Sequence, residues 1–162
     1  MNTDWNDGHV QNWNELARKL SEVSGYFHFD DALNPHDWEK KNDIAKSKQG
    51  VEVIIRKPNE LLLDLDNDES INRYMMMVEV LDVCGAIELV EDWKSKSGNT
   101  HAKITLAFNL TPLEATTLQA IFGSDPQREL LNLIGHLNGI PEPSKLYKYP
   151  ENYKKPSLEE II

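Results

Sequence analysis

The stretch that decides the fold is ELLLDLD, residues 60–66, in which three consecutive leucines lead into two aspartates. An apolar run of this length, preceded by the turn-forming RKPN at residues 56–59, is typical of a buried β-strand. Asp64 and Asp66 are two residues apart, so on a strand their side chains project to the same face of the sheet. Two neighbouring carboxylates repel each other unless a cation lies between them. The same residues are also typical of a strand that runs into an acidic turn.

The segments around this strand predict an α+β fold. The strand-like VEVII precedes it, and apolar residues at helical spacing follow it as far as Gly85. Beyond Gly85 the pattern indicates a strand from residue 86, a turn at Gly98 and Asn99, a strand over 100–108, and helices over 111–122 and 124–139. This order predicts an open antiparallel sheet with helices on one face, as in ferredoxin-like and RNA-recognition-motif folds.

The length of 162 residues suits one domain with a substantial core. We expect a helical N-terminal segment (1–50) packed on the core, an α+β core (51–140) and an extended C-terminal tail (141–162). The first segment contains apolar residues at helical spacing, namely Trp13, Leu16, Leu20 and Val23. The tail contains four prolines, which favour an extended chain that is either laid over the domain or partly disordered.

The composition is typical of a water-soluble protein, with 40% hydrophobic and 27% charged residues and no apolar run long enough to span a bilayer. A single cysteine, Cys84, excludes an intramolecular disulfide and a cysteine zinc cage. We expect a cytoplasmic protein without a membrane partner. The net charge of -10 argues against a protein that coats nucleic acid, but it permits an enzyme with a local basic patch.

A second motif, SKSGNTH at residues 95–101, lies between the two later strands. Serine and glycine in a tight loop can present backbone N–H groups to an anion, and Lys96 and Lys103 add positive charge. His101 begins the returning strand, from which it can reach a phosphate held by Ser97. A soluble hairpin with an exposed histidine has the same pattern.

Taken together, LLLDLD, the helix after it and SKSGNTHAKI resemble the first two motifs of the archaeo-eukaryotic primase superfamily, over roughly residues 51–138. In that family a hydrophobic strand ends in Asp-x-Asp or Asp-x-Glu, and a later Ser-Gly…His stretch enters a strand. The resemblance implies that Asp64 and Asp66 bind catalytic Mg²⁺ or Mn²⁺. It also implies that His101 and Ser97 contact the phosphates of an incoming nucleotide. The implied protein is a small or degenerate primase-polymerase, of the kind that a phage encodes, acting on nucleotides and a DNA template.

The family also uses a third acid, on a later strand. Asp125 in FGSDPQRE is the nearest candidate, with Arg128 beside it as a further nucleotide contact. The local pattern favours a helix cap over a catalytic role, because Pro126 suits a first turn and Ser124 and Gln127 have capping-box spacing. The chain is short for a complete polymerase and contains no zinc motif.

Two other functions fit the same residues. Paired acids also serve a metal-dependent nuclease. A non-enzymatic protein could instead use its acidic surface to mimic DNA or inhibit a host nucleic-acid enzyme. A replication helicase or another host protein is a candidate partner, and the oligomeric state is not defined by the sequence. We expect Met75, Met76 and Met77 to fill the core and Trp93 to pack rather than stack on a base.

Overall fold

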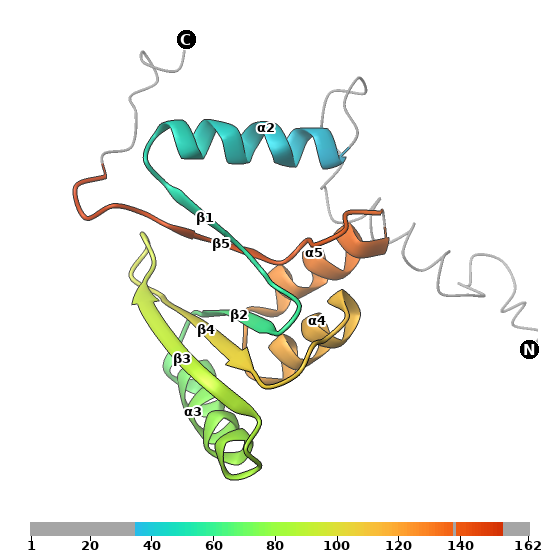
Figure 1. The fold of residues 1–162 in the computed structure, drawn as a ribbon. Coiled ribbons are helices and arrows are strands. Elements are labelled where there is room, and N and C mark those ends of the chain that lie inside the picture. The colour runs from blue at the N-terminus through green and yellow to red at the C-terminus, as the bar shows by residue number, and fades with distance from the viewer. Residues whose placement is uncertain (1–34, 138, 154–162) are drawn as a thin grey trace, which may run out of the picture.

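The computed structural model describes residues 35–137 and 139–153, so the helix expected over residues 13–23 lies outside the described residues (Figure 1). The elements in chain order are α2 (Pro35–Lys48), β1 (Glu52–Ile55), β2 (Glu60–Leu65), α3 (Asp68–Val83), β3 (Ile87–Lys94), β4 (Thr100–Leu106), α4 (Pro112–Ile121), α5 (Pro126–Leu137) and β5 (Lys145–Lys148). Helices and strands alternate along the chain, and the predicted α+β class is confirmed.

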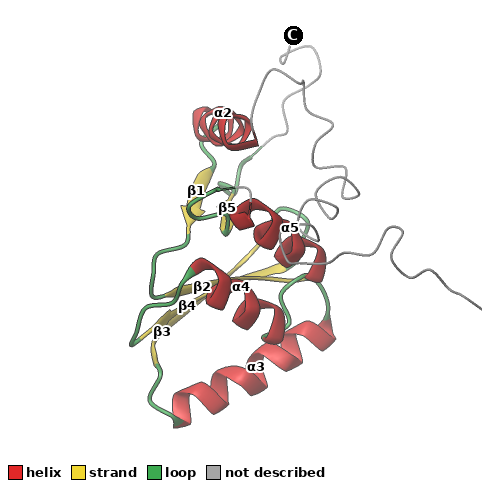
Figure 2. Cartoon of the chain, turned by 90° about the vertical axis from the view of Figure 1, so that its right-hand side faces the viewer, coloured by secondary structure: helices red, strands yellow, loops and turns green. Residues whose placement is uncertain are grey.

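The larger sheet has three strands in the order β2-β4-β3, and both neighbouring pairs are antiparallel. It follows that β2 and β3 are parallel to each other, with β4 inserted between them. α3 connects these two strands and covers one face of the sheet (Figures 1 and 2). The arrangement is therefore a β-α-β unit that is split by a third strand.

The core lies between this sheet, α3 and α4. Alternation along β2 turns Leu61, Leu63 and Leu65 to the helices, and all three are fully buried. They pack with residues from β4, α3 and α4, namely Ala102, Ile104, Leu106, Tyr74, Ala115 and Phe122. The same alternation turns Leu62 and Asp64 to the opposite face, where the candidate site forms.

Local sequence signals place the ends of the helices as expected. Asn67 caps α3, because its side chain accepts a hydrogen bond from the backbone N–H of Ser70. Thr111 caps α4 in a reciprocal capping box with Glu114. Gly85 follows α3 with a φ of 68°, a left-handed conformation that glycine adopts without strain.

The outer edge of β2 is covered by the α4–α5 region instead of a fourth strand. The backbone N–H of Leu62 donates to Gln119 Oε1 at 2.9 Å, and that of Asp64 donates to Ser124 Oγ at 3.1 Å. The Asp64 carbonyl accepts from the backbone N–H of Asp125 at 2.8 Å. These bonds give hydrogen-bond partners to backbone groups on the side of β2 that pairs with no strand, and they hold the backbone of Asp64 in place.

The smaller sheet pairs β1 with β5, so that Val53 lies opposite Tyr147. β5 belongs to the tail that was expected to be extended. It lies on the side of the larger sheet away from α3, below α2 (Figures 1 and 2). This second layer partly covers the face that carries Asp64. Its two strands are distant in the sequence, because β5 pairs with residues of β1 that lie about 90 positions earlier.

The prediction that three methionines fill the core is wrong for two of them. Met75 and Met76 are 61% and 58% exposed, whereas Met77 packs against the core. Three consecutive helical residues are spread over about 200° of the helix circumference, so they cannot all face one side. Tyr74 and Val78 set the side of α3 that faces the core.

Candidate functional site

Three side chains form a row across the face of the sheet that points away from α3. His101 on β4 lies opposite Asp64 on β2 and opposite Trp93 on β3. His101 Nε2 is 3.4 Å from Asp64 Oδ1. The indole of Trp93 meets the imidazole edge-to-face, with 5.8 Å between ring centres and an interplanar angle of 87°. The strand register therefore brings together the acid and the histidine of the two sequence motifs.

Each member of this row has a buried polar atom without a hydrogen-bond partner among the described residues: Asp64 Oδ1, His101 Nδ1 and Trp93 Nε1. The 3.4 Å separation of Asp64 and His101 is an ion-pair distance, longer than an ordinary hydrogen bond. His101 is only 8% exposed. Buried polar atoms in proteins are nearly always hydrogen-bonded, so three such atoms in one row indicate a place where polar ligands are bound.

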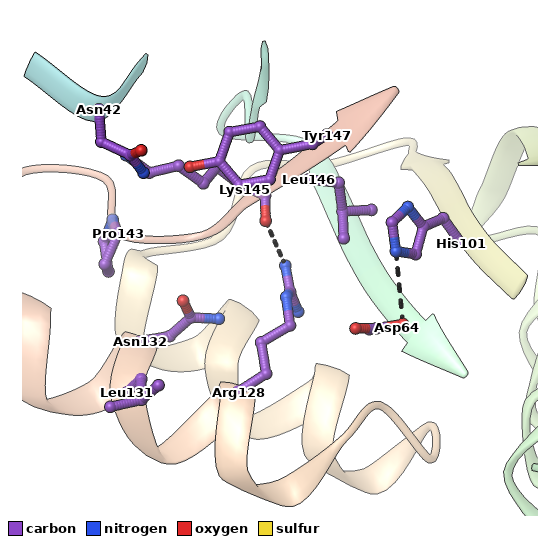
Figure 3. A pocket seen from close by; sticks show the side chains of 10 residues that line it. All are labelled: Asn42, Asp64, His101, Arg128, Leu131, Asn132, Pro143, Lys145, Leu146 and Tyr147. Carbon is purple, nitrogen blue, oxygen red and sulfur yellow. Dashed lines mark hydrogen bonds and ion pairs between the residues drawn. The ribbon is translucent and has the colours of Figure 1, made fainter. Parts of the chain in front are cut away.

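A pocket of about 270 Å³ opens beside the Asp64–His101 pair (Figure 3). Its walls come from the end of the sheet, α2, α5 and β5. The lining residues are Asn42, Asp64, His101, Arg128, Leu131, Asn132, Pro143, Lys145, Leu146 and Tyr147. The pocket is lined by one carboxylate, one imidazole and two cationic side chains, of which Arg128 is paired with Glu129 and Lys145 with Asp43.

Arg128 holds the walls of this pocket together. Its guanidinium donates to the carbonyls of Leu62 at 2.9 Å and Lys145 at 3.1 Å, and to Ser144 Oγ at 3.2 Å. It also forms an ion pair with the buried carboxylate of Glu129. One side chain thus connects β2, α5 and β5, and most of its donors are used by the protein itself.

A buried polar network behind Arg128 was not anticipated from the sequence. Gln119 is 0% and Glu129 3% exposed, and Gln119 Nε2 donates to Glu129 Oε2 at 2.8 Å. Ser124 and Asn132 donate to the same carboxylate at 2.7 Å and 3.0 Å. Nothing in the local pattern distinguishes these residues from exposed helical ones. The feature that could have identified them is the outer edge of β2, whose backbone N–H groups need side-chain partners. That edge is known only once the order of the strands is known.

Asp66 lies just beyond the end of β2 and is exposed, so the two acids of the first motif occupy different pockets. Its carboxylate accepts a hydrogen bond from Asn99 Nδ2 in the β3–β4 turn. Partial burial, followed by the neighbouring carboxylates of Asp64 and Asp125, raises the pKa of Asp66, and His101 opposes this rise. Asp64 and Asp125 are therefore both within electrostatic range of Asp66.

Asp125 is the N-terminal cap of α5. Its two carboxylate oxygens accept from the backbone N–H groups of Gln127 at 3.3 Å and Arg128 at 3.0 Å. It also lines a pocket of about 220 Å³ together with Asp66. The helix-cap interpretation of this residue thus matches its contacts, and the residue is at the same time part of the acidic surroundings of the candidate site.

A metal ion at this site would need ligands from a substrate as well as from the protein. Within residues 35–137 and 139–153, no three Asp, Glu, His or Cys side chains are grouped so as to hold a metal ion. Mg²⁺ is commonly bound through one or two carboxylates, with phosphate oxygens and water supplying the other ligands. Asp64 and Asp66 meet that requirement by residue type, but they line different pockets, so the structure does not place them around one shared hollow.

The predicted phosphate-binding loop surrounds the other side of His101. Ser97 lies in this β3–β4 turn, and its hydroxyl is hydrogen-bonded to that of Ser95 at 3.0 Å. Lys96 is exposed at the tip of the turn. Lys103 instead pairs with Glu91 at 2.6 Å, and this hydrogen bond holds the pKa of Lys103 above its ordinary value. Of the two predicted lysines, Lys96 is therefore the one placed to meet a ligand.

Fold and site together define a small α+β protein with a split β-α-β unit. In it Asp64 on β2 lies opposite His101 on the neighbouring strand β4. Comparison with protein families, curated proteins and solved structures found no match to this chain. Among the helices that the structure describes, none has the length and apolar character needed to cross a membrane.

Proposed function

We propose that this chain is a primase-like nucleotidyltransferase domain that binds a nucleoside triphosphate and Mg²⁺ or Mn²⁺ beside Asp64 and His101, and that uses a DNA template. The observation that carries the proposal is the 3.4 Å contact between Asp64 and His101. These residues belong to the two motifs that resemble the primase superfamily. Their distance in the sequence is large, and only the register of β2 and β4 makes them neighbours.

The strand order supports the same proposal. The order β2-β4-β3, with α3 as the crossover between β2 and β3, is compatible with part of a ferredoxin-like or RNA-recognition-motif sheet. The place of a fourth strand next to β2 is taken by side chains from α4 and α5. This substitution leaves the end of β2 accessible from the pocket that Asp64 lines.

Each residue would have a distinct role. Asp64 and Asp66 would hold the metal, and Asp125 would strengthen the negative field around Asp66. When bound, the metal activates the attacking hydroxyl and stabilises the leaving pyrophosphate. His101 and the loop that contains Ser97 would position the triphosphate through hydrogen bonds.

The two remaining predicted contacts contribute differently. Lys96 would add positive charge at the tip of the loop, where a phosphate can be reached without breaking an existing ion pair. Arg128 would act mainly by fixing the backbone of β2 relative to α5 and β5, since its donors bind Leu62, Ser144 and Lys145. Lys96 would therefore contribute positive charge, and Arg128 would position the backbone of β2.

The test is calorimetric titration with Mn²⁺, with and without a nucleoside triphosphate. We expect Asp64→Asn to weaken Mn²⁺-dependent nucleotide binding at least about ten-fold, and His101→Ala to weaken nucleotide binding more than Mn²⁺ binding. Asp82→Asn, which removes the same charge from the exposed far end of α3, is the matched control and should bind like wild type.

A template assay in Mn²⁺ then distinguishes the reactions. Incorporation of nucleotide into a strand supports the primase-like function, whereas cleavage of the strand would identify a nuclease. Equal Mn²⁺ and nucleotide binding by the wild type and Asp64→Asn would contradict the site altogether. Tight binding of a basic host protein that DNA displaces would favour the DNA mimic.

A further inference from the structure

Aromatic rings and lysines gather where the tip of the β3–β4 hairpin meets β5 and the chain after it. In Figure 1 the hairpin tip rises toward the chain that continues from β5. The rings and the lysines that lie over them come from α2, from the hairpin and from residues 147–153. We call this set the aromatic–lysine surface; it consists of Trp93, Tyr147, Tyr149, Tyr153, Lys46, Lys96 and Lys148.

The contacts in this surface are cation–π contacts. Lys96 Nζ lies 4.6 Å from the ring centre of Tyr153 and 5.4 Å from that of Tyr149. The two tyrosine rings meet edge-to-face with their centres 4.8 Å apart. Lys148 Nζ lies 5.9 Å from the ring of Trp93. Contacts of this kind occur roughly once per 70–80 residues in proteins, so their concentration on one small surface requires a reason.

A cavity of about 390 Å³ lies within the aromatic–lysine surface. It is lined by Ser95, Lys96, Ser97, His101, Tyr147 and Tyr149. His101 and Tyr147 also line the pocket beside Asp64, so the two hollows share a wall. The buried His101 ring, whose Nδ1 has no hydrogen-bond partner among the described residues, belongs to both.

Three lysines lie over the rings of this surface, although the chain as a whole is acidic. The protein carries a net charge of -10, yet Lys96 and Lys148 are exposed on this surface and Lys46 lies over Tyr147. The nearby carboxylate of Asp43 is already engaged by Lys145 at 2.8 Å. A local group of lysines and aromatic rings can attract a polyanion even on an acidic protein, because net charge does not set the local field.

We infer that the aromatic–lysine surface binds single-stranded nucleic acid independently of its base sequence. Bases would stack on the rings of Trp93, Tyr149 and Tyr153, because every base has a π-face and aromatic side chains accept all of them. Each base would replace the ammonium group that lies over its ring in the free protein. The displaced Lys96 or Lys148 would then pair with the adjacent phosphate, so that one cation–π contact is exchanged for a stack and an ion pair.

This inference rests on the proposed function only where it assigns the bound strand a role as template. A strand on this surface would lead past His101 to Asp64. Binding itself requires neither metal nor nucleotide. The Mn²⁺ titration contains no strand and the strand titration contains no metal, so either can fail without the other. Asp64→Asn should bind a strand at least as well as wild type, because it removes a negative charge near the path.

The test is fluorescence anisotropy with labelled oligothymidylate and oligouridylate of about 12 nucleotides, in chelator. We expect the double variant Tyr149→Ala/Tyr153→Ala to bind at least about five-fold more weakly, given the usual stacking contribution per base. Lys96→Gln should lower the slope of log K against log salt by about 0.7 for each lost phosphate contact. Phe108→Ala and Lys57→Gln remove an exposed ring and an exposed charge elsewhere, and both should bind like wild type.

Each outcome decides the matter. Binding of both oligomers with the expected losses supports the inference, and binding of only one, with the same losses, supports it for that kind of strand. No binding of either oligomer by the wild type at low salt would overturn it. Equal losses for the control variants would also overturn it, because binding would then reflect general attraction. Weaker binding by Tyr149→Ala/Tyr153→Ala that comes with a changed thermal midpoint does not separate lost stacking from altered folding. The variant Tyr149→Phe/Tyr153→Phe separates them, because it keeps both rings and should retain binding.

Discussion

Replacing Gln119 by leucine should measure how much the buried polar network stabilises the strand that carries Asp64. Gln119 is completely buried, accepts from the backbone N–H of Leu62 at 2.9 Å and donates to Glu129 at 2.8 Å. Leucine has a similar volume but can form neither bond. The change therefore leaves one buried amide unpaired and removes one donor from a buried carboxylate.

The magnitude follows from these two losses. An unpaired buried amide costs about 1–3 kcal/mol, and the lost bond to the charged Glu129 costs about as much again. Burial of the apolar leucine side chain offsets about 1–2 kcal/mol. We expect the free energy of unfolding to fall by about 2–4 kcal/mol. Urea unfolding followed by circular dichroism should show a lower midpoint with an unchanged slope.

Gln127→Leu provides the matched control, because Gln127 is exposed on α5 and the same change there should alter stability by less than about 0.5 kcal/mol. Hydrogen exchange gives an independent readout, since the amide of Leu62 should exchange faster in Gln119→Leu. A loss below about 1 kcal/mol, with the Leu62 amide still protected, would refute the reasoning that side chains from α4 and α5 close the edge of β2.

Two further predictions concern the site and the turn before α5. The pKa of Asp66 is raised by partial burial and then by Asp64 and Asp125, so the folded protein binds this proton more tightly than the unfolded chain and loses stability as the pH rises above the ordinary aspartate pKa. In chelator, Asp66→Asn should therefore raise the free energy of unfolding at pH 7, by less than about 1 kcal/mol because the carboxylate is largely exposed. The gain should vanish below about pH 3, where this carboxyl group is protonated in the folded and unfolded protein alike. Thermal melts in which the wild type and Asp66→Asn have the same midpoint at pH 7 as well as at low pH would contradict this. Gly123→Ala should lower the free energy of unfolding by about 2–4 kcal/mol, because φ is 96° and a Cβ there would lie 2.9 Å from the backbone oxygen of Ser70. Gly85→Ala, also at positive φ but with nothing within 4 Å, should cost only about 1 kcal/mol in the same urea titration, and equal losses at the two glycines would show that the contact is unimportant.

Features that depend on neighbouring residues were predictable from the sequence. The apolar run in LLLDLD and the alternation in HAKITL predicted two strands, and the faces of their side chains followed because side-chain direction repeats every two residues. Gly98, with φ of 90°, marked the hairpin turn, and Thr111 marked the start of α4. Methionines were misplaced because three adjacent apolar residues carry no information about which of them faces the core.

The candidate site depends on contacts between distant segments, and its geometry was decided by the tertiary structure. The sequence by itself determined that Asp64 is on a strand and that His101 begins another, but a shift of one residue in their register would have separated them. The covering of Asp64 by β5, the capping role of Asp125 and the burial of Glu129 all arise from how α4, α5 and β5 pack on β2. Local patterns determine which elements form and which way their side chains face. Long-range packing decides which of those side chains meet, because it depends on the whole core at once.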